Sequence, residues 1–299
     1  MTQHHVHLGT NQYGKAEVRL VKITRDSPRH EIEDLNVTSE LRGDFESAYR
    51  EGNNEHVIPT DTQKNTVFAF ARDGVGAPET FLIRLANHFT DNFDWVDGGR
   101  WEARQYAWER IHAHGAAHDH SFVRSGQAVR TAVVVRDHAH THVLAGLQEM
   151  TVLKSTESGF EGYPKDRYTT LPETDDRIMA TEITARWRYN TPEVDFNAVY
   201  DSVKALLLEG FAEKYSSALQ QTLFDMGTKV IDAHPEIDEI RLSMPNKHHF
   251  VVDLSPFGLD NPNEVFYAAD RPYGLIEAAV VRDGASEASN AWAHMAGFC

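Results

Sequence analysis

The sequence predicts an α+β fold built from two copies of one ββααββ unit, over residues 1–141 and 142–299. Two observations support this prediction. The order strand, strand, helix, helix, strand, strand can be traced twice along the chain, by alternation of apolar and polar residues in the strands and by apolar residues at helical spacing in the helices. With 299 residues and 41% apolar content, the chain is long enough for two compact units.

The first half contains one complete set of these elements. Residues 16–23 alternate apolar and polar side chains, as in a half-buried strand. Pro78 opens a helix in which Phe81, Leu85 and Phe89 form an apolar stripe. The expected elements are strands at 16–23 and 31–41, helices at 62–72 and from Pro78, and strands at 101–111 and 127–136.

The second half repeats the order. Between residues 177 and 189, Ile183, Ala185 and Trp187 alternate with polar residues, which indicates a strand with one buried face. The expected elements are strands at 143–153 and 177–189, helices after Pro192 and from near Ser217, and strands at 240–244 and 250–254.

Two helices would cover one face of each four-stranded antiparallel sheet, and the other face and both sheet edges need a cover. Another copy of the unit is the simplest cover. We therefore expect antiparallel sheets joined edge to edge into a barrel across subunits, with the helices outside. This arrangement predicts an oligomer with its sites at subunit interfaces.

Composition excludes several functions. The formal net charge of −16 has the wrong sign for a nucleic-acid binder. The first residues lack the basic and apolar regions of a signal peptide, and nowhere do eighteen apolar residues follow one another, so we expect neither export nor a membrane span. The single cysteine, Cys299, cannot form a disulfide or a cysteine-based metal site within one chain.

The strongest local signal is the segment Ser-Met-Pro-Asn-Lys-His-His-Phe at residues 243–250, where polar groups directly follow a strand. Strand ends on a rigid sheet are suitable places for reacting groups. A surface turn that begins at Pro245 and Asn246 and carries solvated Lys and His is the alternative.

Together with other segments, this octapeptide resembles the urate oxidase family, and the resemblance covers nearly the whole chain. It implies tandem T-fold (tunnelling-fold) units in a homotetramer, and a cofactor-independent oxidation of urate in purine breakdown. The motifs that carry it, in chain order, are YGKAEVR at 13–19, TDTQKNT at 60–66, VLKST at 152–156, DRI at 176–178, SMPNKHHF at 243–250 and NEVF at 263–266.

The resemblance implies four substrate-binding positions that suit a flat, oxygen-rich purine. Phe160 would stack on the ring, and Arg177 would give a carbonyl edge two charge-assisted hydrogen bonds. Gln220 would bind the opposite edge with its amide, and the backbone at Leu219 would make a further contact. Taken singly, Phe160 could be ordinary core, Arg177 a surface charge and Gln220 a solvated residue in a first helical turn.

The resemblance also implies a proton-handling group. Lys15 and Thr60, from a neighbouring subunit, would form a base and its relay, and His248 would complete the relay. Asn246, with Thr60, would hold O2 or water above the purine, and Asp61 would orient the substrate through its backbone amide. A strand-edge lysine, a helix cap at residues 60–61 and a turn at residues 246–248 are the alternative interpretations.

This chemistry requires no metal and no cofactor, because deprotonated urate can itself reduce O2. The protein deprotonates and positions the substrate, and the expected products are 5-hydroxyisourate and hydrogen peroxide. Lys15 and Arg177 would also supply the local positive charge that the chain as a whole lacks. The chain ends in Gly-Phe-Cys and not in the Ser-Lys-Leu signal of peroxisomal members, so we expect a cytoplasmic, bacterial-type enzyme.

Three alternative functions remain open. Histidines at alternate positions could bind a transition metal, which would make the protein a metal-dependent oxygenase, although exposed loops rich in histidine are the simpler interpretation. The others are a T-fold enzyme acting on pterins or other purines, and a purine-binding protein without activity. The histidine patches are His4, His5 and His7; His112, His114, His118 and His120; and His138, His140 and His142.

Overall fold

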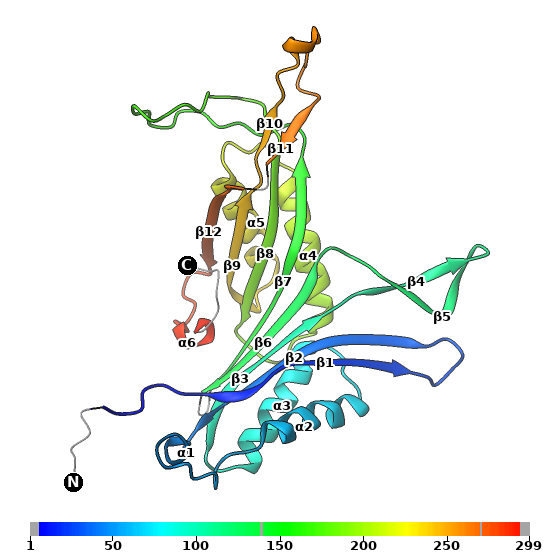
Figure 1. Cartoon of the computed structure of the whole chain (residues 1–299), viewed down its shortest axis with the longest axis vertical. Helices are drawn as coiled ribbons and strands as arrows, with labels where there is room; N and C mark the ends of the chain where they lie inside the picture. Colours follow the sequence, from blue (N-terminus) through cyan, green and yellow to red (C-terminus); the bar gives the residue numbers. More distant parts are fainter. Residues whose placement is uncertain (1–5, 138–139, 270, 294–299) are drawn as a thin grey trace. The chain divides into compact units, whose positions relative to one another are not determined.

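A computed structural model of the chain describes residues 6–137, 140–269 and 271–293. The chain forms two compact units, traced in Figure 1. Unit 1 comprises Met1–Ala145, Tyr189–Phe196 and Ala288–Ala291, and unit 2 comprises Gly146–Arg188, Asn197–Glu287 and Trp292–Cys299. Each unit combines a β-sheet with helices, so the α+β class is confirmed.

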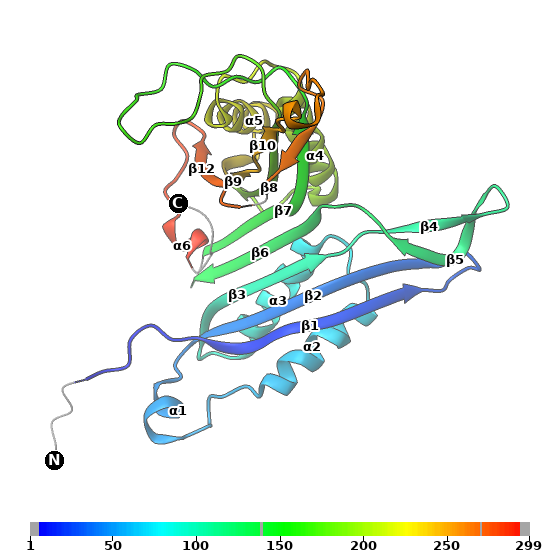
Figure 2. The ribbon, with the colours of Figure 1, turned by 45° about the horizontal axis from the view of Figure 1, so that its top comes forward.

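Unit 1 contains an antiparallel sheet with strand order β1-β2-β3-β6. Helix α2 packs on β1 and helix α3 on β3 and β6, and Figure 2 shows both helices on one face of this sheet. The elements are β1 (Tyr13–Thr24), β2 (Glu31–Gly43), α1 (Glu46–Glu51), α2 (Thr60–Arg72), α3 (Pro78–Asn92), β3 (Val96–Gln105) and β6 (Val129–Asp137).

Helix α3 shows how local sequence produces this packing. Proline occupies its first turn, where a missing N–H costs nothing. Phe81, Leu85 and Phe89 are fully buried on the face toward the sheet, and burial of each such side chain contributes about 1.5–3 kcal/mol. The predicted helix from Pro78 is confirmed.

Unit 2 contains a sheet with strand order β7-β8-β9-β12, in which β9 and β12 are antiparallel. Helix α5 packs on β9 and β12, and Tyr200 of α4 stacks on Trp187 of β8 at 6.2 Å between ring centroids. The elements are β7 (His140–Lys154), β8 (Met179–Tyr189), α4 (Phe196–Ala212), α5 (Leu219–Ala233), β9 (Ile237–Asn246), β10 (His249–Val251), η1 (Ser255–Phe257), β11 (Phe266–Ala268), β12 (Gly274–Val281) and α6 (Ser289–Trp292).

The single strand predicted at 101–111 is wrong, because two strands share this segment. Strand β3 ends at Gln105, which pairs with Arg130, and β4 (Trp108–Ala113) then forms a separate hairpin with β5 (Ala116–Arg124). The residues of β4 are largely exposed on both faces. Alternation of residue types does not distinguish an exposed hairpin from the continuation of a sheet strand.

The fourth sheet strand of unit 2 also differs from the prediction. The segment expected at 250–254 supplies β10, which pairs with β11 in a separate hairpin, and its Phe250 and Val251 are half exposed. The sheet position beside β9 belongs to β12. Gly227 of α5 permits this packing, since a Cβ there would lie 2.5 Å from the side chain of Val280.

None of the helices in the described residues is long and apolar enough to cross a membrane.

Candidate active site

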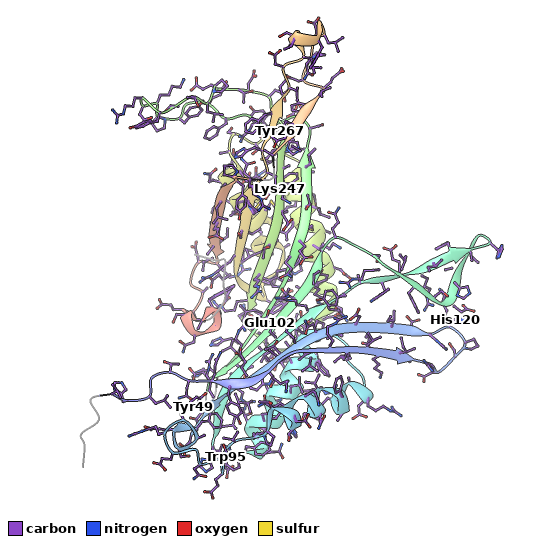
Figure 3. All side chains as sticks on the ribbon, in the orientation of Figure 1. Tyr49, Trp95, Glu102, His120, Lys247 and Tyr267 are labelled. Carbon is purple, nitrogen blue, oxygen red and sulfur yellow. The ribbon has the colours of Figure 1, made fainter. Side chains whose placement is uncertain are left out.

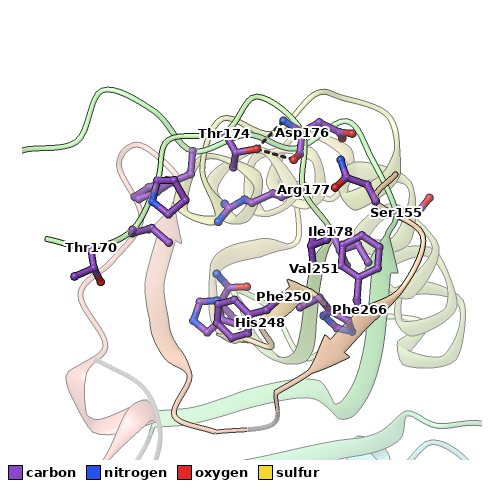
Figure 4. A pocket seen from close by; sticks show the side chains of 16 residues that line it. Ser155, Thr170, Thr174, Asp176, Arg177, Ile178, His248, Phe250, Val251 and Phe266 are labelled. Carbon is purple, nitrogen blue, oxygen red and sulfur yellow. Dashed lines mark hydrogen bonds between the residues drawn. The ribbon is translucent and has the colours of Figure 1, made fainter. Parts of the chain in front are cut away.

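A pocket of about 580 Å³ in unit 2 gathers four of the predicted site residues, Phe160, Arg177, Asn246 and His248. In Figure 4, Arg177 and His248 face the same space from opposite sides. Strand ends and loops supply its walls, which include Ser155, Phe160, Thr170, Leu171, Pro172, Thr174, Asp176, Arg177, Ile178, Asn246, His248, His249, Phe250, Val251, Asn263 and Phe266.

Arg177 is half-buried and lines the pocket. Its Cζ lies 5.2 Å from the centroid of the Phe160 ring, and its Nε faces the Ser158 Oγ at 3.4 Å. Burial lowers the pKa of Arg177, and within the described part of the chain no carboxylate pairs with it. The terminal N–H groups of the guanidinium are therefore available for an external acceptor beside an aromatic ring.

Asn246 is the last residue of β9, and the chain beyond it is fixed to the sheet. The backbone N–H of Lys247 donates to the Ala180 carbonyl at 2.8 Å, and the Lys247 Nζ pairs with Glu182 at 2.8 Å. His248 then projects into the pocket, half-buried. Burial, followed by the charge of Arg177, lowers the pKa of His248, so the neutral imidazole is favoured at neutral pH.

Leu219 and Gln220 form the first turn of α5. The first intrahelical bond joins the Thr222 N–H to the Ala218 carbonyl, and Ala218 provides no capping side chain. Leu219 is buried, whereas Gln220 is exposed. Neither residue is among those that line the pocket, but the preceding loop is bonded to the segment that carries Phe160, through a bridge between Ser158 and Ser216.

The other three predicted residues, Lys15, Thr60 and Asp61, form a second group in unit 1. The Tyr13 hydroxyl accepts from the Ile58 N–H at 2.7 Å and donates to the Ile58 carbonyl at 3.1 Å, which fixes the start of α2 beside β1. The sheet register is regular to Lys15 and shifts after it. Lys15 lies close enough to Asp61 for its charge to affect that carboxylate.

The backbone amides of Thr60 and Asp61 precede the first intrahelical bond of α2, which Gln63 makes to Pro59. The Asp61 carboxylate is engaged by Lys64 and by Asn65, and the hydrogen bond from Lys64 is the largest cause of its lowered pKa. Helix N-termini favour negative charge, so these amides are suitable donors to an anion. Helix α3 also starts without a capping side chain, so this feature alone identifies no site.

The sequence-based prediction missed most of the pocket wall. Asp176, Ile178, Asn263 and Phe266 lie within or beside motifs already recognised, so those motifs contained the signal. Residues 170–172 belong to a long loop without a motif, which is closed by hydrogen bonds between Phe160 and Thr174 of 2.7 and 3.2 Å. Only the fold brings this loop to the pocket.

The histidine patches do not form a metal centre in the described residues, where no three His, Cys, Asp or Glu side chains are arranged to hold a metal. The patch at 112–120 lies on the β4–β5 hairpin, where Figure 3 labels His120. His118 and His120 lie 4.5 Å apart between ring centroids. His4, His5 and His138 lie outside the described residues.

Sequence comparison links the chain to one family. A family model described as Uricase matches residues 11–135 and 143–277. The uricase of Arthrobacter globiformis is 63% identical over 292 residues, which is 98% of this chain and 95% of that protein. The uricase of Danio rerio is 38% identical over 277 residues, which is 90% of this chain and 93% of that protein.

Structural comparison agrees. The crystal structure of uricase from Arthrobacter globiformis matches with a TM-score of 0.93 at 63% identity and covers 97% of this chain and 99% of that chain. A urate oxidase from Bacillus sp. TB-90 matches with a TM-score of 0.80 at 20% identity, over 91% of this chain and 100% of that chain, and so supports the fold alone. The family model and the relatives span most of the chain, and the chain belongs to the uricase family.

Proposed function

We propose that this chain is a urate oxidase whose site is assembled from the pocket of unit 2 and from the Lys15 group of a second subunit. The observation that carries this proposal is the position of Arg177 beside Phe160, with no carboxylate paired to it in the described residues. Urate needs an aromatic face and a planar donor fork, and this pair offers both.

In the proposed complex, Phe160 stacks on the purine and Arg177 donates two parallel hydrogen bonds to a carbonyl edge. Gln220 binds the opposite edge through its side-chain amide, and Leu219 through its backbone N–H. The uncapped first turn of α5 supports the role of Leu219, because its backbone N–H precedes the first intrahelical bond.

The proposed chemistry begins with removal of a proton from urate. Lys15 acts as the base, and the hydroxyl of Thr60 and the imidazole of His248 relay the proton. The favoured neutral form of His248 suits a relay, because one ring nitrogen accepts a proton while the other donates one. Asn246, with Thr60, holds O2 or water above the purine plane, and the backbone amide of Asp61 orients the substrate.

The reaction balances with urate, O2 and water. Urate loses two electrons and two protons, and O2 takes up both and leaves as hydrogen peroxide. Water then adds to the oxidised purine, with its hydroxyl on carbon and its proton on nitrogen, to give 5-hydroxyisourate. The protein contributes proton transfer, positioning and a preorganised polar pocket.

The assembly is also part of the proposal. Strands β1 and β12 are the edge strands at the two ends of the strand order, and both expose apolar side chains, including Val21 (54% exposed) and Leu275 (60% exposed). The β10–β11 hairpin, where Figure 3 labels Tyr267, exposes further apolar residues. These surfaces support a homotetramer in which the repeats at 1–141 and 142–299 join copies edge to edge and sites lie at interfaces.

Turnover of metal-stripped protein with urate tests the function. The amount of urate lost, followed by its absorbance, should equal the amount of O2 taken up and the amount of peroxide released. EDTA should have no effect on the rate. Absence of turnover would refute the proposal. Activity that EDTA abolishes and a transition metal restores would favour a metal-dependent oxygenase instead.

A further inference from the structure

Three segments of unit 2 that carry proposed substrate-binding residues meet around Gly159. The Gly159 N–H donates to the Ser216 carbonyl at 2.9 Å, and the Ser216 N–H donates to the Glu157 carbonyl at 3.0 Å. The Arg177 N–H donates to the Ser158 carbonyl at 2.8 Å. The backbone therefore joins the segment before Phe160, the segment before β8 and the loop before α5.

The side chain of Tyr215 crosses this junction. Its hydroxyl donates to the Asp175 carbonyl at 2.8 Å, two residues before Arg177. A Cβ built on Gly159 would lie 2.2 Å from the same phenol oxygen and 3.0 Å from the Thr174 carbonyl oxygen. The backbone of Gly159 is not in the left-handed region, so a side chain here would be opposed by the phenol oxygen and not by the dihedral angle.

Tyr215 itself stands outside the pocket, because it is not among the lining residues, and its side chain is 45% exposed. Burial, followed by the carboxylates of Glu161 and Asp175, raises the pKa of Tyr215. The phenol therefore remains a protonated donor at neutral pH.

We propose that Tyr215 is a positioning residue that holds Phe160, Arg177 and the first turn of α5 in one arrangement for a planar purine. The inference rests on the proposed function, because it assigns a purine to this pocket. Gly159 supports this role, since a Cβ at that position would force the phenol away from its place beside Asp175.

The main test is Tyr215→Phe, which removes the hydroxyl and keeps the ring. The KM for urate and the Kd of a non-oxidisable urate analogue should each rise roughly threefold to tenfold, as expected for loss of one hydrogen bond, while kcat stays within about twofold. Tyr106→Phe is the control, because it removes a half-buried phenol oxygen in unit 1 and should leave KM, Kd and kcat unchanged.

A second variant tests the contact directly. Gly159→Ala should raise KM in the natural chain through its clash with the phenol oxygen, and by a smaller factor in a Tyr215→Phe background, where that oxygen is gone. An unchanged KM and analogue Kd in Tyr215→Phe would overturn the positioning role, even if its midpoint of thermal unfolding falls. Wild-type protein that does not oxidise urate would overturn the proposed function instead, so the two failures are distinguishable.

Discussion

Removal of the Arg177 guanidinium is the sharpest test of the proposed substrate complex. In Arg177→Gln, the side chain keeps a planar amide but loses its charge and the two parallel donors. Nε faces Ser158 at 3.4 Å and no carboxylate in the described residues competes, so in the proposed complex both terminal nitrogens can donate to the substrate. Each charge-assisted hydrogen bond contributes about 1.5–3 kcal/mol, so the pair amounts to about 3–6 kcal/mol.

This range corresponds to a fall in kcat/KM of about 10²- to 10⁴-fold, with a matching loss in affinity for a non-oxidisable analogue. Arg177→Lys, which keeps the charge and loses the fork, should lose about 10- to 100-fold. The assay is initial-rate loss of urate absorbance across substrate concentrations. Arg167→Gln is the control, because it removes an exposed arginine of the loop beside the pocket and changes the net charge equally.

A kcat/KM for Arg177→Gln within about threefold of the natural enzyme would refute the reasoning, because a guanidinium that binds the substrate cannot be removed at so small a cost. Equal losses in Arg177→Gln and Arg167→Gln would also refute it. Equal losses would mean that kcat/KM falls because an anionic substrate is attracted less strongly by the positive charge of the protein as a whole.

Three further predictions follow from individual side chains. Lys15→Met should lower kcat by about 10²- to 10⁴-fold and leave analogue binding nearly intact, and equal loss of both would contradict its role as a base. The pKa of His248 lies below the ordinary histidine value of about 6.5, so its imidazole stays neutral to a lower pH than a free histidine does. The acid limb of the kcat/KM profile should therefore lie below pH 6.5, and it should disappear in His248→Asn. Glu79 is fully buried and pairs with Arg130 at 2.7 Å, so Glu79→Gln should lower the free energy of unfolding, measured in urea, by about 3–5 kcal/mol, while the exposed control Glu55→Gln should be nearly neutral.

The local sequence predicts those helices and strands whose apolar residues recur at a regular spacing. The buried stripe of α3 is an example, since Phe81, Leu85 and Phe89 recur at helical spacing and face the sheet. The place of β12 could not be predicted in this way, because it follows from pairing with β9 across the intervening residues 247–273. The segment 274–281, which local periodicity did not single out, takes that position and packs against α5, where Gly227 leaves room for the side chain of Val280.

The residues of the candidate site also fall into two groups, those that a motif predicts and those that only the fold brings to the pocket. Arg177 and His248 were predicted from motifs, and the structure places both on the wall of the pocket. The wall at Leu171 was not, because hydrogen bonds within its own loop, such as that from the Tyr163 hydroxyl to the Leu171 carbonyl at 2.6 Å, fix its position. The positive φ of Glu17, at the irregularity that follows Lys15, also depends on pairing between β1 and β2.

The division of the predicted residues between two units permits a test of the shared site. Lys15 belongs to unit 1 and Arg177 to unit 2, and we propose that each site takes Lys15 from one subunit and Arg177 from another. Lys15→Met and Arg177→Gln should each be nearly inactive alone. When the two variants are unfolded together and refolded, sites that draw both natural residues should form in about one quarter of random pairings. Recovered activity near that fraction supports the interface site, whereas no recovery in a mixture shown to contain both chains in one assembly would mean that a single subunit supplies both residues.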